Sequence, residues 1–210
     1  MHIQIVDHPL AAISLTRLRD ETTTRPAFRA ALRDLSRHLV YEASRGLATR
    51  DVEINTPMGP TTGIALGPER ELPLLVPVLR AGLGMLDAAL AVLPEARTGF
   101  IGLKRNEETL QPDVYLDTVP SDLGGQPVMV LDPMLATAGS AIHACRSLHD
   151  ANAGAITVVC VLSAPEGVEA LTASGLADTH VTAAVDSHLN EIGYIVPGLG
   201  DAGDRQFGVD

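Results

Sequence analysis

Short apolar runs alternate with stretches of helical spacing over most of the chain after residue 73. Five runs have the length and composition of buried strands, at residues 74–79, 98–103, 128–131, 156–162 and 180–186. Segments of about ten residues that suit helices lie between them, at 85–93, 141–150 and 165–174. Continuous apolar strands separated by helices are typical of a mostly parallel sheet covered on both faces. The pattern therefore predicts an α/β fold, a mostly parallel sheet flanked by helices.

Before this region, one long amphipathic helix is expected. Thr24 and Pro26 suit a helix start, and Gly46 suits an end. Between them, apolar residues recur at helical spacing at Phe28, Leu32, Leu35, Leu39 and Ala43. This stripe could serve the core or a subunit contact, and we expect the core. Neither an internal repeat nor a linker-like segment divides the chain, so residues 1–210 are predicted to form a single domain.

Composition narrows the possible partners. The 210 residues are 46% hydrophobic but only 3% aromatic, and the net charge is −11. Because no basic run offsets that charge, nucleic acid is not expected as the main partner. A highly anionic substrate would need a local cluster of cations.

Cysteine and histidine usage bears on location and metals. Cys145 and Cys160 lie in apolar segments without a CxxC pair, which favours buried thiols in a reducing compartment. Without a signal pattern or long apolar span, a soluble, cytoplasmic protein with no membrane partner is expected. The seven histidines show no metal-ligand spacing, so a protein-caged transition metal is not expected.

The richest chemical pattern is the stretch VMVLDPMLATAGS at residues 128–140. An apolar run ends at Asp132, and small and hydroxyl residues then lead into a helix. Free N–H groups at a helix start bind phosphate, Thr137 and Ser140 can donate hydrogen bonds, and Gly139 allows close approach. The alternative is an ordinary strand–turn–helix connection.

This stretch resembles the phosphoribosyl-diphosphate signature of the phosphoribosyltransferases, and its DPMLAT wording resembles their uracil branch. The resemblance implies that Asp132 holds ribose hydroxyls and that the residues after it bind the substrate, with Ala136 to Ser140 around the 5-phosphate. The implied substrate-binding residues are Asp132, Pro133, Met134, Leu135, Ala136, Thr137, Ala138, Gly139 and Ser140. Ala138 stands where the branch usually has glycine, a change that matters only if φ there is positive.

Two further segments extend the resemblance. VPVLRAGLGM, residues 76–85, places Arg80 at the carboxyl end of a predicted strand, where ligands bind in open α/β sheets. In the uracil branch this is the diphosphate-binding loop, which implies that Arg80 contacts the leaving group. Residues 104–126 match the loop that covers the active site there, with Arg105 as a second cation for the diphosphate. The alternative for this segment is a solvated hairpin.

The C-terminal run contains GxGxxG at residues 198–203. A dinucleotide site is not expected, because Pro197 precedes the glycines and too few residues follow for the required helix and acid. A loop that presents backbone groups to a small ligand is expected instead. GYIVPGLGDAGDR closely resembles the uracil pocket of the branch. Carried across, backbone groups of Ile195, Gly200 and Ala202 bind the base, and Asp201 touches the ribose-phosphate substrate.

Together these segments predict transfer of phosphoribosyl from phosphoribosyl diphosphate to N1 of uracil, giving UMP and diphosphate. Arg80, Arg105 and Asp132 are the expected catalytic residues; no general base is assigned. Mg²⁺ is expected as cofactor, held mainly by substrate and water. The resemblance also implies a homo-oligomer with an N-terminal helical extension and a C-terminal base-binding hood, and it suggests GTP binding and allosteric control. Departures from the branch occur at Thr118, where many relatives have lysine nearby, and at His188.

Three other functions stay open. The first is an RNA-binding regulator that keeps the transferase fold, against which the acidic charge counts. The second is a transferase for another base such as a purine, although purine branches lack GYIVPGLGDAGDR. The third is a non-catalytic structural protein, which three loops with substrate-type residues make the weakest alternative.

Overall fold

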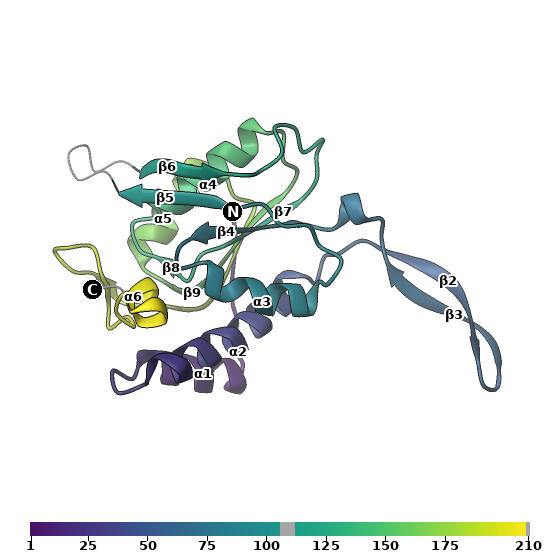
Figure 1. The fold of residues 1–210 in the computed structure, drawn as a ribbon, viewed down its shortest axis with the longest axis horizontal. Coiled ribbons are helices and arrows are strands. Elements are labelled where there is room, and N and C mark those ends of the chain that lie inside the picture. Colours follow the sequence, from purple (N-terminus) through teal and green to yellow (C-terminus); the bar gives the residue numbers. More distant parts are fainter. Residues whose placement is uncertain (106–111, 209–210) are drawn as a thin grey trace.

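A computed structural model describes residues 1–105 and 112–208. Within these residues, eight strands form one sheet in the order β1–β10–β9–β7–β4–β5–β6, with β8 beside β9 (Figure 1). Neighbouring strands are parallel except β5 and β6. The strands are β1 His2–Ile5, β4 Leu74–Leu79, β5 Ile101–Arg105, β6 Pro112–Asp117, β7 Val128–Leu131, β8 Met134–Leu135, β9 Ile156–Ser163 and β10 Thr179–Val185. The predicted fold class is confirmed.

The apolar runs located the strands well, with one clear error. β4 and β7 have the predicted bounds, β9 is one residue longer than predicted, and β10 begins and ends one residue earlier. The run at 98–103 was misplaced, because the strand starts at Ile101 and Thr98 makes only an isolated bridge to Leu75. β5 instead continues into the polar residues Lys104 and Arg105, which pair with β6.

Helices cover both faces of the sheet (Figure 1). α1 Pro9–Arg19, α2 Arg25–Ala43 and α3 Leu83–Val92 pack on one face, and α4 Gly139–Asp150 and α5 Pro165–Ser174 on the other. Alternate residues of each strand serve the two faces, since side chains point to opposite sides of a sheet. The first core contains Leu75 and Met129, and the second contains their neighbours Leu74 and Val128.

The amphipathic helix is α2, and its apolar stripe is core. Phe28, Leu32, Leu35 and Leu39 are each at most 1% exposed, which confirms the expectation over a subunit contact. Thr24 is the N-cap residue as predicted. The helix ends at Ala43, somewhat before the glycine expected to stop it. Within the described residues, no helix has the length and apolar character needed to cross a membrane.

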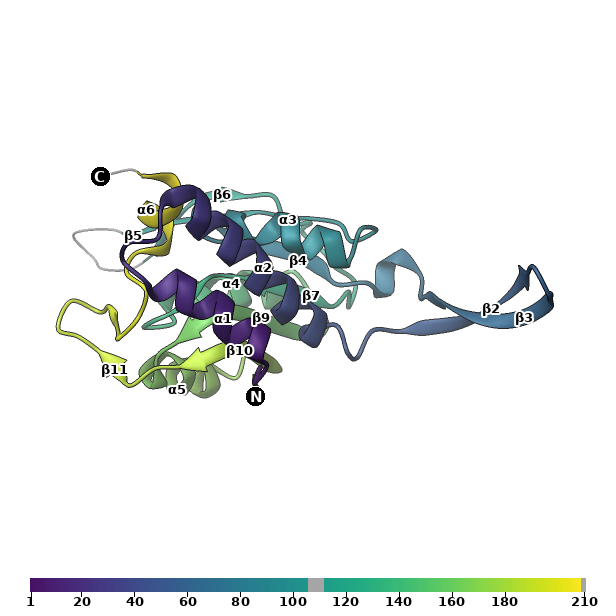
Figure 2. The same cartoon turned by 90° about the horizontal axis from the view of Figure 1, so that it is seen from below.

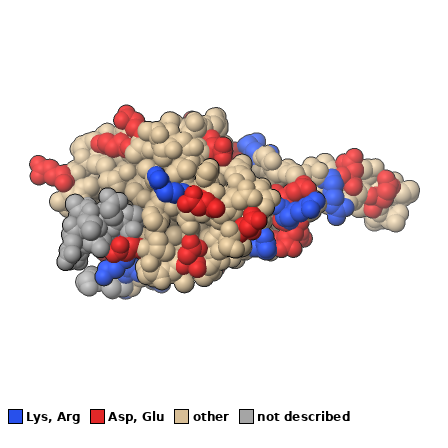
Figure 3. Space-filling model, turned by 90° about the horizontal axis from the view of Figure 1, so that it is seen from above, with Lys and Arg blue, Asp and Glu red and all other residues tan. Residues whose placement is uncertain are grey.

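A hairpin that the sequence analysis did not predict projects far from the body (Figures 1 and 2). Its strands, β2 Thr49–Thr56 and β3 Gly59–Leu66, form a separate two-stranded sheet. Acidic and basic side chains lie side by side along it (Figure 3), and Met58 and Ile64 are 96% and 75% exposed. The 3₁₀ turn η1, Glu69–Glu71, follows the hairpin and leads to β4.

The C-terminal region differs from its prediction in one respect. β11 His188–Leu189 and β12 Ile195–Val196 form a small antiparallel sheet. A helix, α6 Ala202–Phe207, then begins inside the GxGxxG stretch, where only a loop was expected. Asp201 explains the helix, because its carboxylate accepts a hydrogen bond from the Asp204 N–H (2.9 Å) as a capping residue does. α6 has six residues, fewer than the helix of a dinucleotide-binding βαβ unit.

Candidate active site

The loops that follow β4 and β7 meet at one edge of the sheet. The two strands are parallel neighbours, so both end at this edge. A Cβ on Gly82 would overlap the carbonyl oxygen of Leu131 and lie 2.7 Å from the backbone N and O of Val78. Only glycine lets the chain after Arg80 pack directly against the end of β7. The sequence therefore brings the Arg80 loop next to Asp132.

The C-terminal helix joins these loops through a buried glutamine. Gln206 of α6 is fully buried, and its amide nitrogen donates to the carbonyl oxygens of Ala81 (3.1 Å) and Ala202 (2.8 Å). At the surface, the Arg80 guanidinium lies 3.9 Å from the Asp204 carboxylate. Both of those side chains are about half exposed, so the ion pair itself adds little stability. The buried contact fixes the Arg80 loop and α6 side by side.

Asp132 follows β7 directly and is partly buried. Burial raises the pKa of its carboxyl group to about 7, and a hydrogen bond from the Met134 backbone N–H acts in the opposite direction. At neutral pH a carboxyl group with this pKa is about half ionised, so it can either accept or donate a hydrogen bond. Perturbed acids in this position favour a functional site.

The residues after Asp132 are more regular than predicted. Met134 and Leu135 form β8, which pairs with the end of β9, and the Pro133 carbonyl oxygen accepts from the N–H groups of Val161 (2.9 Å) and Leu162 (3.0 Å). Leu135 is 1% exposed and packs in the second core. Of the residues expected to bind substrate, Pro133 and Leu135 are therefore placed with their side chains in the interior.

The next residues form a compact turn into α4. Ala136 packs closely against α5, where a Cβ on Gly167 would overlap its carbonyl oxygen. Thr137, Gly139 and Ser140 are exposed at the start of α4, where backbone N–H groups lack partners within the helix. This end of the helix suits an anion, as the sequence predicted.

Ala138 has a left-handed backbone at the N-cap of α4, with φ 64° and ψ 4°. Left-handed backbone is costly for a residue with a Cβ. Alanine in place of the glycine usual in the uracil branch is therefore expected to lower stability, because φ at this position is positive. Ala138 is also 4% exposed, so its methyl group packs in the interior.

The C-terminal glycine-rich loop closes the same edge. Ile195 is buried in β12, and Ala202 is buried at the start of α6. Gly198 and Gly200 have positive φ, 66° and 78°, and a Cβ on Gly198 would overlap the Ile195 carbonyl oxygen. Asp201 is exposed and caps α6, so its Oδ1 is already engaged by a backbone N–H.

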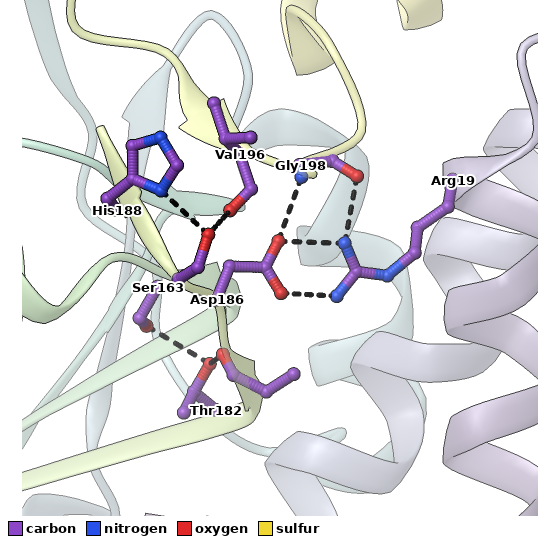
Figure 4. Close-up of polar contacts among 9 residues, drawn as sticks. Arg19, Ser163, Thr182, Asp186, His188, Val196 and Gly198 are labelled. Atoms are coloured by element: carbon purple, nitrogen blue, oxygen red, sulfur yellow. Dashed lines mark hydrogen bonds and ion pairs between the residues drawn. The ribbon is translucent and has the colours of Figure 1, made fainter. Parts of the chain in front are cut away.

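Two arginines missed by the sequence analysis hold this loop to α1. Arg19 makes two hydrogen bonds to Asp186 and one to the Gly198 carbonyl oxygen (Figure 4). Arg205 donates to carbonyl oxygens at the end of α1 and to that of Leu199 (2.9 Å). Arg205 lies in the GYIVPGLGDAGDR segment and Arg19 lies near the N-terminus, but nothing in the sequence indicated that both contact the same loop.

The segment 104–126 begins as a hairpin, because β5 and β6 pair antiparallel. The Arg105 side chain, together with residues 106–111, lies outside the described part of the chain. Thr118 accepts a hydrogen bond from the Phe100 N–H (2.8 Å), and Asp117 accepts from Ser147 of α4 (3.0 Å). Thr118 thus has a structural contact of its own, as does its neighbour Asp117. His188, the other departure, is exposed and bonds Ser187 (2.8 Å).

Three buried side chains, one histidine and two cysteines, lie outside this arrangement. His180 is fully buried between Ser163 (2.8 Å) and the Val158 carbonyl oxygen (3.1 Å), and burial lowers its pKa to about 4. Both cysteines are buried and free, as expected, and burial raises the pKa of the Cys145 thiol to about 12. The buried thiols and the neutral imidazole are structural features rather than reactive groups.

A parallel sheet whose edge carries an acid after one strand, an arginine loop after its neighbour and a helix start a few residues beyond the acid defines the class as a phosphoribosyltransferase. The family model described as uracil phosphoribosyltransferase matches residues 5–209. The chain belongs to the uracil phosphoribosyltransferase family, whose members are pentosyltransferases.

Individual relatives agree with this assignment. The chain is 53% identical to a uracil phosphoribosyltransferase of Corynebacterium diphtheriae, over 99% of this chain and 97% of that one. It is 52% identical to the enzyme of the same name from Corynebacterium glutamicum strain R, with the same coverage. The solved structure of the AQ2163 protein from Aquifex aeolicus superposes with a TM-score of 0.91 at 38% identity, over 99% of both chains. Adenine phosphoribosyl transferase from Trypanosoma brucei, at a TM-score of 0.51 and 12% identity, shares the fold.

Proposed function

We propose that the chain transfers the 5-phosphoribosyl group of phosphoribosyl diphosphate to N1 of uracil, giving UMP and diphosphate in pyrimidine salvage. The observation that carries this proposal is the contact of the Arg80 loop with both the end of β7, through Gly82, and α6, through Gln206. The segments predicted to contact the diphosphate, the ribose and the base therefore meet at one edge of the sheet. Membership of the uracil family supports the choice of base.

In the proposed mechanism, the chain positions charge rather than forming a covalent intermediate. Breaking the anomeric bond leaves positive charge on the ribose and negative charge on the departing diphosphate. Arg80, which is exposed at the end of β4, would grip diphosphate oxygens through its planar fork. Arg105 is proposed as a second cation from the sequence alone. Stabilisation of the leaving group and correct orientation then supply the rate enhancement.

The phosphoribosyl half is proposed to bind between Asp132 and α4. Ionised Asp132 accepts hydrogen bonds from ribose hydroxyls, and the positive charge that develops on the sugar ring as the anomeric bond breaks favours that ionised form. The backbone N–H groups at the start of α4 and the hydroxyls of Thr137 and Ser140 receive the 5-phosphate. No described side chain is assigned as general base.

Uracil recognition is proposed to rest on backbone groups of Ile195, Gly200 and Ala202, with Asp201 on the ribose-phosphate. Uracil presents an N–H between two carbonyl groups, whereas cytosine inverts this pattern at two adjacent positions. Fixed backbone donors and acceptors discriminate well, because the wrong base leaves a buried polar group unpaired at a cost of roughly 1–3 kcal/mol.

The described residues would hold Mg²⁺ only together with oxygen atoms of the substrate. Among the described residues there is no cluster of three or more acidic, His or Cys side chains able to hold a metal. Asp132 supplies a single carboxylate, and Mg²⁺ commonly takes one carboxylate together with phosphate oxygens and water. The ion would neutralise diphosphate charge. GTP binding with allosteric control, and a cytoplasmic location, remain predictions from the sequence.

A homo-oligomer is also proposed, with the β2–β3 hairpin as the contact arm. Isolated two-stranded hairpins are marginally stable in water, and this one exposes Ile54, Met58 and Ile64. Covering these side chains with a second copy of the chain would remove apolar surface from water.

The direct test is to measure UMP formed from uracil, phosphoribosyl diphosphate and Mg²⁺. Cytosine and hypoxanthine in place of uracil serve as controls, and GTP is added in a parallel series. Uracil should be used and the controls should not. A preference for hypoxanthine would reassign the base, and tight RNA binding at physiological salt without UMP formation would favour the regulator.

A further inference from the structure

We propose that Arg19 and Asp186 are positioning residues for base recognition, which set the orientation of the glycine-rich loop that binds uracil. This inference rests on the proposed function. It assigns to the N-terminal helical extension a part in substrate specificity, because Arg19 is the last residue of α1.

The contact has the geometry of a two-pronged clamp (Figure 4). The two terminal nitrogens of Arg19 donate to Oδ2 (2.8 Å) and Oδ1 (2.5 Å) of Asp186. One of these nitrogens also donates to the Gly198 carbonyl oxygen (2.9 Å), and the Gly198 N–H donates to Asp186 Oδ2 (2.8 Å). Both polar groups of one loop residue are therefore held by the same ion pair.

Burial makes this ion pair costlier to break than a surface pair. The Asp186 side chain is 6% exposed and that of Arg19 is 26% exposed. Burial alone would raise the pKa of Asp186, but hydrogen bonds from Arg19 and Gly198 outweigh it and lower the pKa. Removing Arg19 would leave a buried carboxylate with one backbone donor, and such a charge cannot stay in place without cost.

Asp186 joins the clamp to the rest of the site. It directly follows β10, and its N–H donates to the carbonyl oxygen of Ser163 at the end of β9 (2.8 Å). Its position is therefore fixed by the sheet, on the edge where the substrate loops meet. The sheet fixes the position of Asp186, and Asp186 and Arg19 together hold Gly198 of the loop.

Arg205 supports the clamp from the other side of the loop. It donates to the carbonyl oxygens of Leu18, Asp20 (2.6 Å) and Leu199 (2.9 Å), and its guanidinium carbon lies 4.4 Å from the centre of the Phe28 ring. Carbonyl groups at a helix end lack partners within the helix and attract cations. The end of α1 is thus fastened to the loop at two successive residues, Gly198 and Leu199.

The consequence for uracil follows from the position of Gly198. It lies three residues after Ile195 and two before Gly200, and its left-handed φ of 66° turns the chain between them. With its N–H and C=O both fixed, the directions of the neighbouring peptide groups are fixed as well. A base read by backbone groups depends on those directions, since shifts of about 1 Å are costly in a preorganised site.

The experiment compares Arg19→Lys, Arg19→Gln and Asp186→Asn with the wild-type enzyme. Arg17→Gln is the matched control, because Arg17 is an exposed arginine in the same last turn of α1. We expect the KM for uracil to rise roughly ten- to hundredfold in Arg19→Gln and Asp186→Asn, while the KM for phosphoribosyl diphosphate stays within about threefold. Arg19→Lys should recover part of this loss, and Arg17→Gln should match the wild type.

Several outcomes would overturn the inference. A fall in kcat with both KM values unchanged would show that the pair does not position the base. A lowered melting temperature with unchanged kinetics in the folded fraction would make the pair purely structural. If Arg19→Gln unfolds, Arg19→Lys keeps the charge and carries the same comparison. If the wild type forms no UMP from uracil, the proposed function fails first and this inference with it.

Discussion

Gly82 and Leu131 lie so close that a side chain on Gly82 would overlap the Leu131 carbonyl oxygen. This relationship joins the loop that carries Arg80 to the strand that presents Asp132. It is made by backbone atoms, which cannot move aside as a flexible side chain can.

Gly82→Ala should therefore lower the free energy of unfolding by about 2–4 kcal/mol and abolish most activity, because the two loops must separate. Urea unfolding monitored by circular dichroism gives the first quantity. Gly46→Ala is the control, since a Cβ there meets nothing within 4 Å. Equal stability of the two variants would contradict the packing described.

Asp132→Asn should lower kcat/KM by roughly ten- to hundredfold while stabilising the free protein at alkaline pH. The folded pKa of about 7 lies above the ordinary value of 3.8 for an aspartic acid, so the folded state binds this proton more tightly. Protonated Asp132 contributes fully to the free energy of unfolding below about pH 4, and this contribution is lost as the pH rises towards 7.

The stability difference between Asp132→Asn and wild type should accordingly grow from pH 4 to pH 7 and stay level above that. Because water still reaches part of Asp132, we expect a plateau of roughly 1–3 kcal/mol rather than the full value of the shift. Chemical unfolding at four or five pH values measures it. A difference independent of pH would show that the carboxyl group is ordinarily solvated.

Ala138→Gly should stabilise the protein by up to about 1 kcal/mol, because glycine adopts the left-handed backbone of this position without a Cβ penalty. The KM for phosphoribosyl diphosphate should stay within about threefold, because strain that is present in both the free and the bound protein cancels in the affinity. Thermal unfolding and initial rates provide the two measurements.

Asn152→Gly is the comparison for Ala138→Gly, since Asn152 is the other non-glycine residue described with positive φ (58°). Asparagine tolerates that backbone, and its side chain donates to Asp122 (3.1 Å), so glycine should bring no gain there. If both variants behaved alike, relief of backbone strain would not be the cause.

Ile64→Asp, placed on the projecting hairpin, should shift an oligomeric wild-type protein towards monomers without changing its circular dichroism. A charge buried in a subunit contact is costly, whereas the same charge in water is not. Sedimentation velocity measures the mass, and Ile64→Val is the control that keeps the surface apolar. An unchanged mass for Ile64→Asp would remove the hairpin from the contact.

The extent to which sequence predicted structure follows from how each element is stabilised. β4 and β7 are continuous apolar runs buried on both faces, so composition alone located them. The β2–β3 hairpin contributes little to the core, and the alternation of Val52 and Ile54 before the Pro57–Met58 turn was overlooked. β8 is two residues long, too short for any periodicity.

The candidate site divides in the same way. Asp132 and Arg80 follow recognisable strands, and the fold places both at the expected edge. The left-handed backbone of Ala138 could not be predicted, since alanine usually indicates a right-handed helix. Arg19 and Asp186 are separated by 167 positions, and only the folded chain shows that they pair.

That wide separation has a consequence for folding. Contacts between distant segments form late, because the entropy of closing a long stretch of chain must be overcome before they contribute. Arg19 reaches Gly198 across 179 positions. The pocket for the base should therefore form after the sheet during folding, and it should unfold at a lower denaturant concentration than the sheet. Catalytic turnover should then decline at urea concentrations where far-ultraviolet dichroism still reports a native backbone.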